Sequence, residues 1–289
     1  MSPLLTSSSM NKLANYRLVN GKRHVSGRRG THASKRYGSS LDFSDFRVYE
    51  AGDDVRQIDW NVYARTDKLF IKRFLDEEEM RVHIVLDTTP SMGEEDKWLH
   101  ARQVAALFGY LVLSHDDALS FSAKQDERLQ SFRKKGSMYR HLFQQKVEEL
   151  TPVTRNEPFL EDLVQQLPKD AGSVFIITDG LEPIEQFEKT CQQLTRRPKD
   201  IRFVVVSSQE EQDPEYYGDY LLVDKESTSS LNVTVTPDMI KRYETKRKSH
   251  FEQMEQLANR YGHHILFLPS QPDFLTAALQ QFVRFQWIR

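Results

Sequence analysis

Two short segments of the sequence place oxygen-bearing side chains directly after apolar runs. In the first, Asp87, Thr89 and Ser91 put one carboxylate and two hydroxyls at alternate positions. In the second, Asp179 comes just after residues 173–177. Hard cations such as Mg²⁺ bind oxygen ligands and keep several waters in an octahedral shell. Two carboxylates and two hydroxyls meet that demand, so the two segments predict a divalent-cation site.

The apolar runs themselves must position these side chains. Residues 82–86 and 173–177 are short, apolar and rich in β-branched types, which is typical of buried strands. A helix with a wide apolar face is expected after the first run, over about residues 97–114. Ligands of parallel α/β sheets gather at the carboxyl ends of the strands. We therefore expect Asp87 and Asp179 to meet at one edge of a sheet.

The rest of the chain continues the alternation of strand and helix patterns. Further strands are expected at residues 118–122, 201–206 and 263–268, and further helices at 138–150, 157–167, 184–194, 237–261 and 274–285. Such alternation predicts a mostly parallel sheet with helices on both faces.

The first motif resembles the metal-ion-dependent adhesion site (MIDAS) of von Willebrand factor A domains. That site has the pattern Asp-x-Ser-x-Ser, a later Thr, and an Asp in a Thr-Asp-Gly turn. Asp87, Thr89 and Ser91 match its first part, with Thr89 replacing a Ser but keeping a hydroxyl, and Asp179 matches its last part. The later Thr is assigned to Thr154, with Ser137 as the alternative, since no Gly-Thr-Asp signature is present.

This resemblance implies Mg²⁺, or else Mn²⁺ or Ca²⁺, as the bound ion. It implies that the ion is held either by the chain alone or only together with a partner's carboxylate. The ligands would be Asp87, Thr89, Ser91, Thr154 and Asp179. A purely structural alternative is that the two aspartates cap helices and fix turns.

A second motif lies upstream, over residues 41–60 and 64–66, where arginines stand among aspartates around a Gly-Asp-Asp turn. Its marked residues are Arg47, Tyr49, Gly52, Asp53, Asp54, Arg56, Asp59, Trp60 and Arg65. It resembles the hallmark segment of the domain of unknown function 58 family. The resemblance runs from about residue 15 to the end of the sequence.

The second motif has two interpretations. Arginine pairs with carboxylates bidentately, so the motif predicts a charge-paired loop network that fixes a small module against the A-like domain, with Tyr49 and Trp60 as packing anchors. The alternative is a surface that binds a partner protein.

Composition excludes several classes of protein. With 38% hydrophobic and 28% charged residues the chain is not wholly disordered, and a formal net charge of −2 gives no overall attraction to nucleic acid. There is one cysteine, no run of about 18 apolar residues and no signal-peptide pattern. We therefore expect a cytoplasmic protein without a membrane span.

Three segments are expected along the chain. Residues 1–14 read as a disordered arm, because the first 40 residues hold eight Lys and Arg and no acid. Residues 15–80 should form a small β-rich module. Residues 81–289 should form the von Willebrand factor A-like, or Rossmann-like, α/β domain, with a hairpin insertion at 215–236.

The resemblances imply a non-enzymatic bacterial adaptor that works with a MoxR-type AAA+ ATPase in the maturation or activation of client proteins. The chain lacks a P-loop and so does not itself look like an ATPase. One alternative is a metal-dependent hydrolase that uses the same carboxylates, although two-metal chemistry needs more acidic or histidine ligands than the sequence places there. Another is a scaffold whose site is vestigial.

Overall fold

The computed structural model describes residues 3–19, 43–74, 79–125, 128–153, 159–196, 199–214, 218–223 and 230–289. The chain divides into two compact units. Unit 1 combines Met1–His24 with Met80–Arg289, and unit 2 is Val25–Glu79. Each unit is described by itself below.

Unit 1 is built on a six-stranded sheet in the order β10–β7–β6–β3–β4–β5. The strands are β3 (Arg81–Leu86), β4 (Ala118–Gln125), β5 (Arg128–Lys135), β6 (Ser173–Thr178), β7 (Asp200–Ser207) and β10 (His264–Pro269). Neighbouring strands are parallel except for β5, which pairs antiparallel with β4 at the edge. The predicted mostly parallel α/β sheet is confirmed, whereas the sequence pattern did not predict β5.

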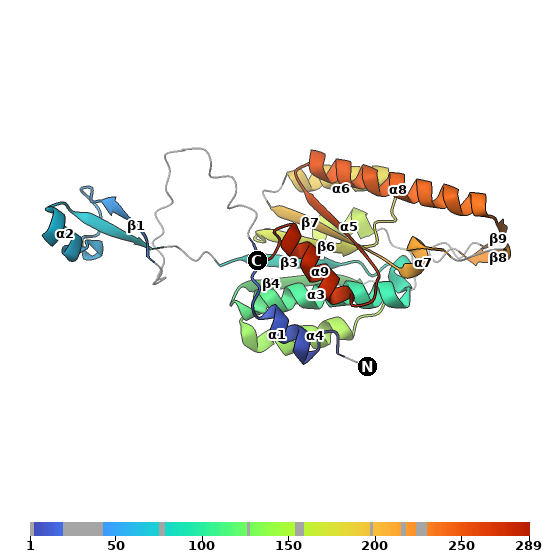
Figure 1. Ribbon diagram of the computed structural model, residues 1–289, viewed down its shortest axis with the longest axis horizontal. Coiled ribbons are helices and arrows are strands. Elements are labelled where there is room, and N and C mark those ends of the chain that lie inside the picture. Colours follow the sequence, from blue (N-terminus) through green and yellow to red (C-terminus); the bar gives the residue numbers. More distant parts are fainter. Residues whose placement is uncertain are drawn as a thin grey trace. The chain divides into compact units, whose positions relative to one another are not determined.

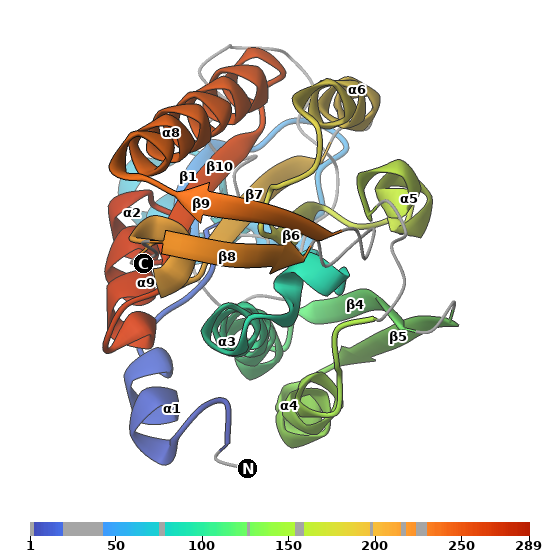
Figure 2. The same cartoon turned by 90° about the vertical axis from the view of Figure 1, so that its right-hand side faces the viewer.

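Helices cover both faces of this sheet. One face carries α3 (Glu95–Ser114), α4 (Arg140–Glu148) and α9 (Phe274–Arg284), and the other carries α5 (Phe159–Gln166), α6 (Ile184–Thr195) and α8 (Pro237–Arg260), as Figures 1 and 2 show. Across the described ranges, no helix combines the length and the apolar character that crossing a bilayer requires.

Strand residues alternate between the two faces, as the two-residue period of a strand requires. In β6, Phe175 and Ile177 join the core under α3 and α9, whereas Val174 and Ile176 join the core under α5, α6 and α8. All four side chains are fully buried. Burial on both faces explains why this strand reads as a continuous apolar run in the sequence.

The N-terminal segment packs on unit 1, which corrects the expectation of a disordered arm. Its helix α1 (Ser7–Leu13) is capped by Thr6, and Leu13 is buried. After it, Arg17 and Arg289 exchange backbone hydrogen bonds of 2.9 and 3.0 Å, so the chain's first and last described segments lie side by side. Buried leucines before the helix and this pairing tie the segment down, which polar, basic composition alone did not indicate.

A separate hairpin follows β7. The short helix α7 (Gln209–Gln212) leads to β8 (Gly218–Val223) and β9 (Ser230–Val235), which pair antiparallel as a two-stranded sheet. Figure 1 shows the hairpin beside α7 at one end of unit 1, and Figure 2 views it from that end. The expected hairpin within 215–236 is therefore present.

Unit 2 holds a second antiparallel pair, β1 (Phe43–Val48) and β2 (Phe70–Phe74). Between them come a 3-10 turn, η2 (Val55–Gln57), and a helix, α2 (Trp60–Thr66), which the sequence pattern did not predict. The β-rich module expected at 15–80 thus contains a helix as well, and the helix α1 and its neighbours belong to unit 1.

The contact between α3 and α4 generates a stability prediction. A Cβ added at Gly109 would lie 1.9 Å from Cε1 of the buried Phe143 ring, so Gly109→Ala must displace a packed aromatic side chain. We expect the free energy of unfolding to fall by about 1–3 kcal/mol in urea titrations, despite the better helix propensity of alanine. Gly172→Ala is the control, because its nearest neighbour would lie at 3.6 Å. Equal stability of the two variants would contradict this packing.

Candidate functional site

Asp87 and Asp179 stand at the carboxyl ends of two neighbouring strands. Asp87 follows β3 and Asp179 follows β6, and these strands pair in parallel with Leu86 opposite Ile177. The amide of Asp87 also donates to the carbonyl of Ile177 at 2.9 Å. The register of two paired strands therefore brings together the two carboxylates that the sequence predicted to meet. Together with Thr89 and Ser91 they are called the carboxylate site below.

Asp87 is held by hydrogen bonds to both of its oxygens. Its Oδ1 accepts from the Thr89 amide at 2.9 Å and from the Thr89 hydroxyl at 2.7 Å, while Oδ2 accepts from the Thr178 hydroxyl at 2.6 Å. The Thr89 and Ser91 hydroxyl oxygens lie 3.1 Å apart. The Thr89 hydroxyl therefore lies directly against the Asp87 carboxylate, and the Ser91 hydroxyl lies next to that of Thr89.

The loop carrying these hydroxyls is short and well anchored. It enters a 3-10 turn, η3 (Pro90–Gly93), and its Thr88 hydroxyl donates to the carbonyl of Lys124 on β4. The amide of Val153 donates to the Thr88 carbonyl at 2.7 Å. These two contacts hold the loop against β4 and against the segment that ends at Val153.

The later hydroxyl ligand has two candidates. Thr154 lies outside the described residues, although Val153 next to it reaches the site loop. Ser137, the alternative, begins the turn η4 (Ser137–Tyr139) after β5, whose last residue pairs with Ala118 at the start of β4. Because β4 runs parallel to β3, that end of the sheet is opposite the carboxylate site. Ser137 is therefore excluded.

A buried lysine completes the site. Lys97, in the first turn of α3, places its Nζ 3.1 Å from Oδ2 of Asp179 and 2.6 Å from Oε1 of Glu211 on α7. Its side chain is 1% exposed. The other Asp179 oxygen, Oδ1, accepts from the Leu181 amide at 3.2 Å. Asp179 thus forms an ion pair with an ammonium group that it shares with Glu211.

Sequence reasoning missed Lys97, although a signal was present. Ala101, Val104, Ala105 and Phe108 share its side of the helix by the spacing of 3.6 residues per turn, which puts Lys97 on the apolar stripe. A lysine on such a stripe is buried only when it is paired. Glu211 carried no comparable signal in the sequence.

Charge accumulates at the carboxylate site. Burial, and then the negative charge of Asp179, raise the pKa of the Asp87 carboxyl to about 7, although hydrogen bonds from Thr178 and Thr89 act in the opposite direction. Burial favours the neutral amine of Lys97, but Asp179 and Glu211 outweigh it and hold the pKa of Lys97 above its ordinary value. A further cation beside Asp87 would therefore be electrostatically favoured.

The donor set fits a hard divalent cation in its chemistry, since every group offered is a carboxylate or hydroxyl oxygen. Within the described ranges, no three His, Cys, Asp or Glu side chains gather closely enough to hold a metal. The hydroxyls of Thr89 and Ser91 would therefore have to serve as ligands, as in the predicted arrangement. Lys97 is the feature that this arrangement did not anticipate.

The upstream motif makes local contacts within unit 2. Arg47 pairs with Asp53 at 2.6 Å and with Glu50 at 3.3 Å. Asp54 caps η2, and Asp59 caps α2 and pairs with Lys72 at 3.2 Å. These contacts agree with the charge-paired network that the sequence predicted.

Other members of that motif lie at the surface of unit 2. Trp60, predicted as a packing anchor, is 61% exposed at the start of α2 and meets the exposed Tyr63 edge to face. Arg56 and Arg65 are also exposed. Tyr49 is half-buried, and Gly52 has φ of 108°, a conformation that favours glycine in its turn.

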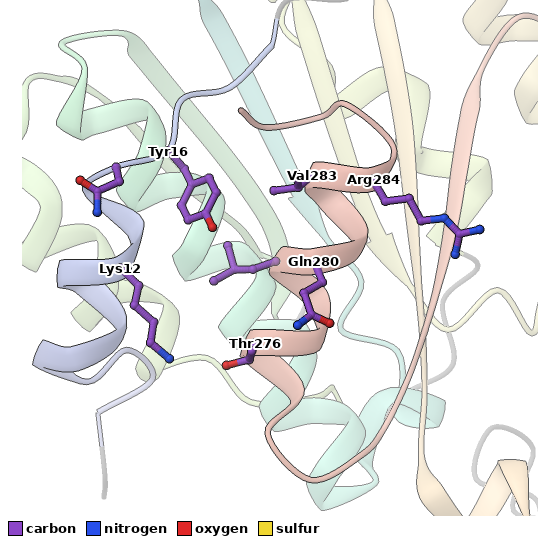
Figure 3. A pocket seen from close by; sticks show the side chains of 8 residues that line it. Lys12, Tyr16, Thr276, Gln280, Val283 and Arg284 are labelled. Atoms are coloured by element: carbon purple, nitrogen blue, oxygen red, sulfur yellow. The ribbon is translucent and has the colours of Figure 1, made fainter.

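A separate pocket of about 680 Å³ lies between α1 and α9. Figure 3 shows Lys12 and Tyr16 on one side of it and Gln280, Val283 and Arg284 on the other. Its lining includes none of the residues of the carboxylate site, so the pocket and the site are different features.

The Thr178 hydroxyl provides a test of the site's geometry. Thr178→Val keeps the shape of the side chain but removes the 2.6 Å donor to the buried Asp87 carboxylate. Because a buried charged acceptor loses a partner, we expect a loss of about 2–3 kcal/mol in unfolding free energy, measured with chelator present. Thr190→Val, which removes a buried hydroxyl bonded to backbone carbonyls, should cost about 1 kcal/mol. A Thr178 variant as stable as the wild type would contradict the described contact.

Comparisons with known proteins found a family, sequence relatives and solved structures that are similar to this chain. An uncharacterized protein of Mycobacterium tuberculosis, Rv1480, is 22% identical over 263 residues, covering 88% of this chain and 82% of its own length. Among solved structures, BatB from Bacteroides thetaiotaomicron is similar with 10% identity and a TM-score of 0.42, covering 71% of this chain and 98% of its own. The SpRpn10 VWA domain gives the same identity and TM-score, with 70% and 95% covered. Residues 45–253 match the family described as "Protein of unknown function DUF58", and the chain belongs to that family.

Proposed function

We propose that the chain is a protein-interaction module whose carboxylate site holds a divalent cation, Mg²⁺ in the first place, that accepts an acidic side chain of a partner protein. Asp87, Thr89, Ser91 and Asp179 would hold the ion, with Thr154 as a further ligand. One observation carries the proposal: two buried carboxylates and two hydroxyls lie together at the carboxyl ends of β3 and β6. The two hydroxyl oxygens are 3.1 Å apart.

The electrostatics support this proposal. Two carboxylates at neighbouring strand ends repel each other, as the raised pKa of Asp87, caused by burial and by Asp179, reflects. A divalent cation would relieve that repulsion and would keep ligand positions for water or for an incoming carboxylate. A partner's acidic side chain would then bind through the metal rather than against bare negative charge.

The β8–β9 hairpin would supply apolar contacts for the same partner. It follows α7 at the carboxyl end of β7, the end of the sheet that also carries the carboxylate site. Leu221 is 60% and Val223 58% exposed, and as alternate residues of β8 they lie on one face of the hairpin. No strand in the described ranges pairs with the hairpin's outer edges. Exposed apolar side chains of this kind lose water-contacting surface when a partner covers them.

A MoxR-type AAA+ ATPase is the first partner to test, because the family resemblance implies it. The partner is required to present an acidic side chain next to an aliphatic surface. Client proteins would then be handled by the pair.

Metal-dependent binding can be tested with a matched pair of serine variants. Ser91→Ala removes one metal-ligand hydroxyl and leaves both carboxylates in place, so we expect partner affinity in Mg²⁺ to fall at least tenfold. Ser249→Ala on the exposed face of α8, where the Ser249 hydroxyl accepts from the exposed Gln253, should leave affinity unchanged. The measurement is calorimetry or pull-down of the ATPase with Mg²⁺ and with chelator.

Two outcomes would count against the proposal. Partner binding that is equal with Mg²⁺ and with chelator would remove the metal from the mechanism. Turnover of phosphate esters that requires Mg²⁺ and is lost in Asp87→Asn would instead support a metal-dependent hydrolase.

The hairpin's contribution makes a second prediction. Leu221→Ser and Val223→Ser together should weaken partner binding about tenfold, because the buried apolar area is lost, and should leave Mg²⁺ affinity unchanged. Leu142→Ser, at a 49% exposed position on α4, is the control. If the control and the double variant bind the partner equally well, the hairpin takes no part in the interface.

A further inference from the structure

Lys97 contacts Asp179, a carboxylate that the proposed metal ion would also use. Its Nζ donates to Oδ2 of Asp179 at 3.1 Å, and it is almost completely shielded from water. We propose that Lys97 is a tethered cation that competes with the divalent ion for Asp179 and thereby sets the metal affinity of the site. This inference rests on the proposed function, which it deepens by naming the residue that regulates metal occupancy.

Neither oxygen of Asp179 is without a donor. Oδ1 accepts from the amide of Leu181 at 3.2 Å, which is fixed by the turn, and Oδ2 accepts from Lys97. A backbone amide cannot leave without rebuilding the turn, whereas a lysine side chain can rotate. A metal ion that acts on Asp179 must therefore displace the ammonium group, because two cations repel strongly at such separations.

Glu211 gives the displaced ammonium a second partner. Its Oε1 lies 2.6 Å from Lys97 Nζ, the shorter of the two ion pairs. Its other oxygen accepts from the Ser208 amide at 3.0 Å, in a capping box that begins α7. Glu211 is thus held in place by α7 and can keep Lys97 when the contact to Asp179 is lost.

The position of α7 is itself tied to the start of α3. The Asp96 carboxylate accepts from the Gln209 amide at 2.9 Å, so the helix that carries Lys97 and the helix that carries Glu211 are connected next to the ion pair. Lys97 Nζ therefore lies between two fixed carboxylates and contacts both. Its balance between them decides how much of the Asp179 charge is available to a metal ion.

Substitutions of Lys97 and of Glu211 should change the Mg²⁺ affinity in opposite directions. Lys97→Met removes the competing cation, so Mg²⁺ affinity should rise at least tenfold. Glu211→Gln removes the alternative partner, so Lys97 should bind Asp179 more tightly and Mg²⁺ affinity should fall about threefold or more. Titration calorimetry of the full chain with MgCl₂ and with MnCl₂ measures both.

The neighbouring ion pair Lys124–Asp162 provides controls of the same charge. Lys124 Nζ on β4 lies 2.9 Å from Oδ2 of Asp162 on α5. Lys124→Met and Asp162→Asn change the net charge as the test variants do. Each should change Mg²⁺ affinity less than twofold, which separates direct competition from the general effect of charge.

The outcomes distinguish this inference from the proposed function. Binding heat in Lys97→Met that exceeds or first reveals that of the wild type supports the inference. Equal, measurable Mg²⁺ affinity in the two proteins overturns it and leaves the metal site standing. An absence of binding in every variant overturns both the inference and the metal site.

A second measurement uses the unmodified chain, in case Lys97→Met does not fold. A buried, paired ammonium group gives a side-chain ¹H–¹⁵N signal by NMR, which Lys97→Arg would assign by its disappearance. Saturating Mg²⁺ should shift this signal and leave that of Lys124 in place. A Lys97 signal unchanged by Mg²⁺ would show that the ammonium stays on Asp179 and would overturn the inference.

Discussion

Two buried carboxylates are held next to each other by the pairing of β3 with β6, and the surrounding structure is arranged to compensate their charge. Asp87 is satisfied by hydroxyl and amide donors, whereas Asp179 is satisfied by a lysine. Like charges this close in a buried place are costly unless a counter-charge is present. The start of α3 supplies that counter-charge, and Glu211 on α7 shares it.

The compensation links segments that are far apart in the sequence. Lys97 lies 82 residues before Asp179 and 114 residues before Glu211. One ammonium group therefore connects three parts of the fold: α3, the end of β6, and α7, which leads into the β8–β9 hairpin. Tyr243 on α8 adds to this connection, since its hydroxyl donates to the Glu211 carbonyl at 3.0 Å. A change at the carboxylate site would therefore reach α7 directly through Lys97.

The sequence was sufficient for those elements whose pattern is set by burial. The runs 82–86 and 173–177 are apolar because both faces of their strands are covered, so the strands and the carboxyl-end placement of the two aspartates could be predicted. The edge strand β5 escaped notice because only Phe132 among its residues is buried, which leaves little apolar periodicity. The helix α1 was missed for a similar reason, since its packing depends on Leu4 and Leu5 before it and on Leu13 at its end.

In the candidate site, too, some residues could be predicted from the sequence and others could not. Asp87, Thr89, Ser91 and Asp179 stand at strand ends, where the fold class itself indicates a ligand-binding edge. Glu211 could not be predicted, because its partner is chosen by how α7 folds back on α3 and not by any local pattern.

In the proposed interaction, the metal-bound carboxylate would orient the partner, and the apolar surface of the hairpin would add affinity. A carboxylate bound to a metal ion orients a partner strongly, but attraction between exposed charges is screened at physiological salt. Apolar contact with the hairpin does not depend on salt in this way, so it would supply affinity that persists when the electrostatic part is weakened. A partner with an acidic side chain but no aliphatic neighbour would be held weakly, and an aliphatic surface without the acid would lack orientation. Having both features at one end of the sheet would therefore select for a partner that presents the two together.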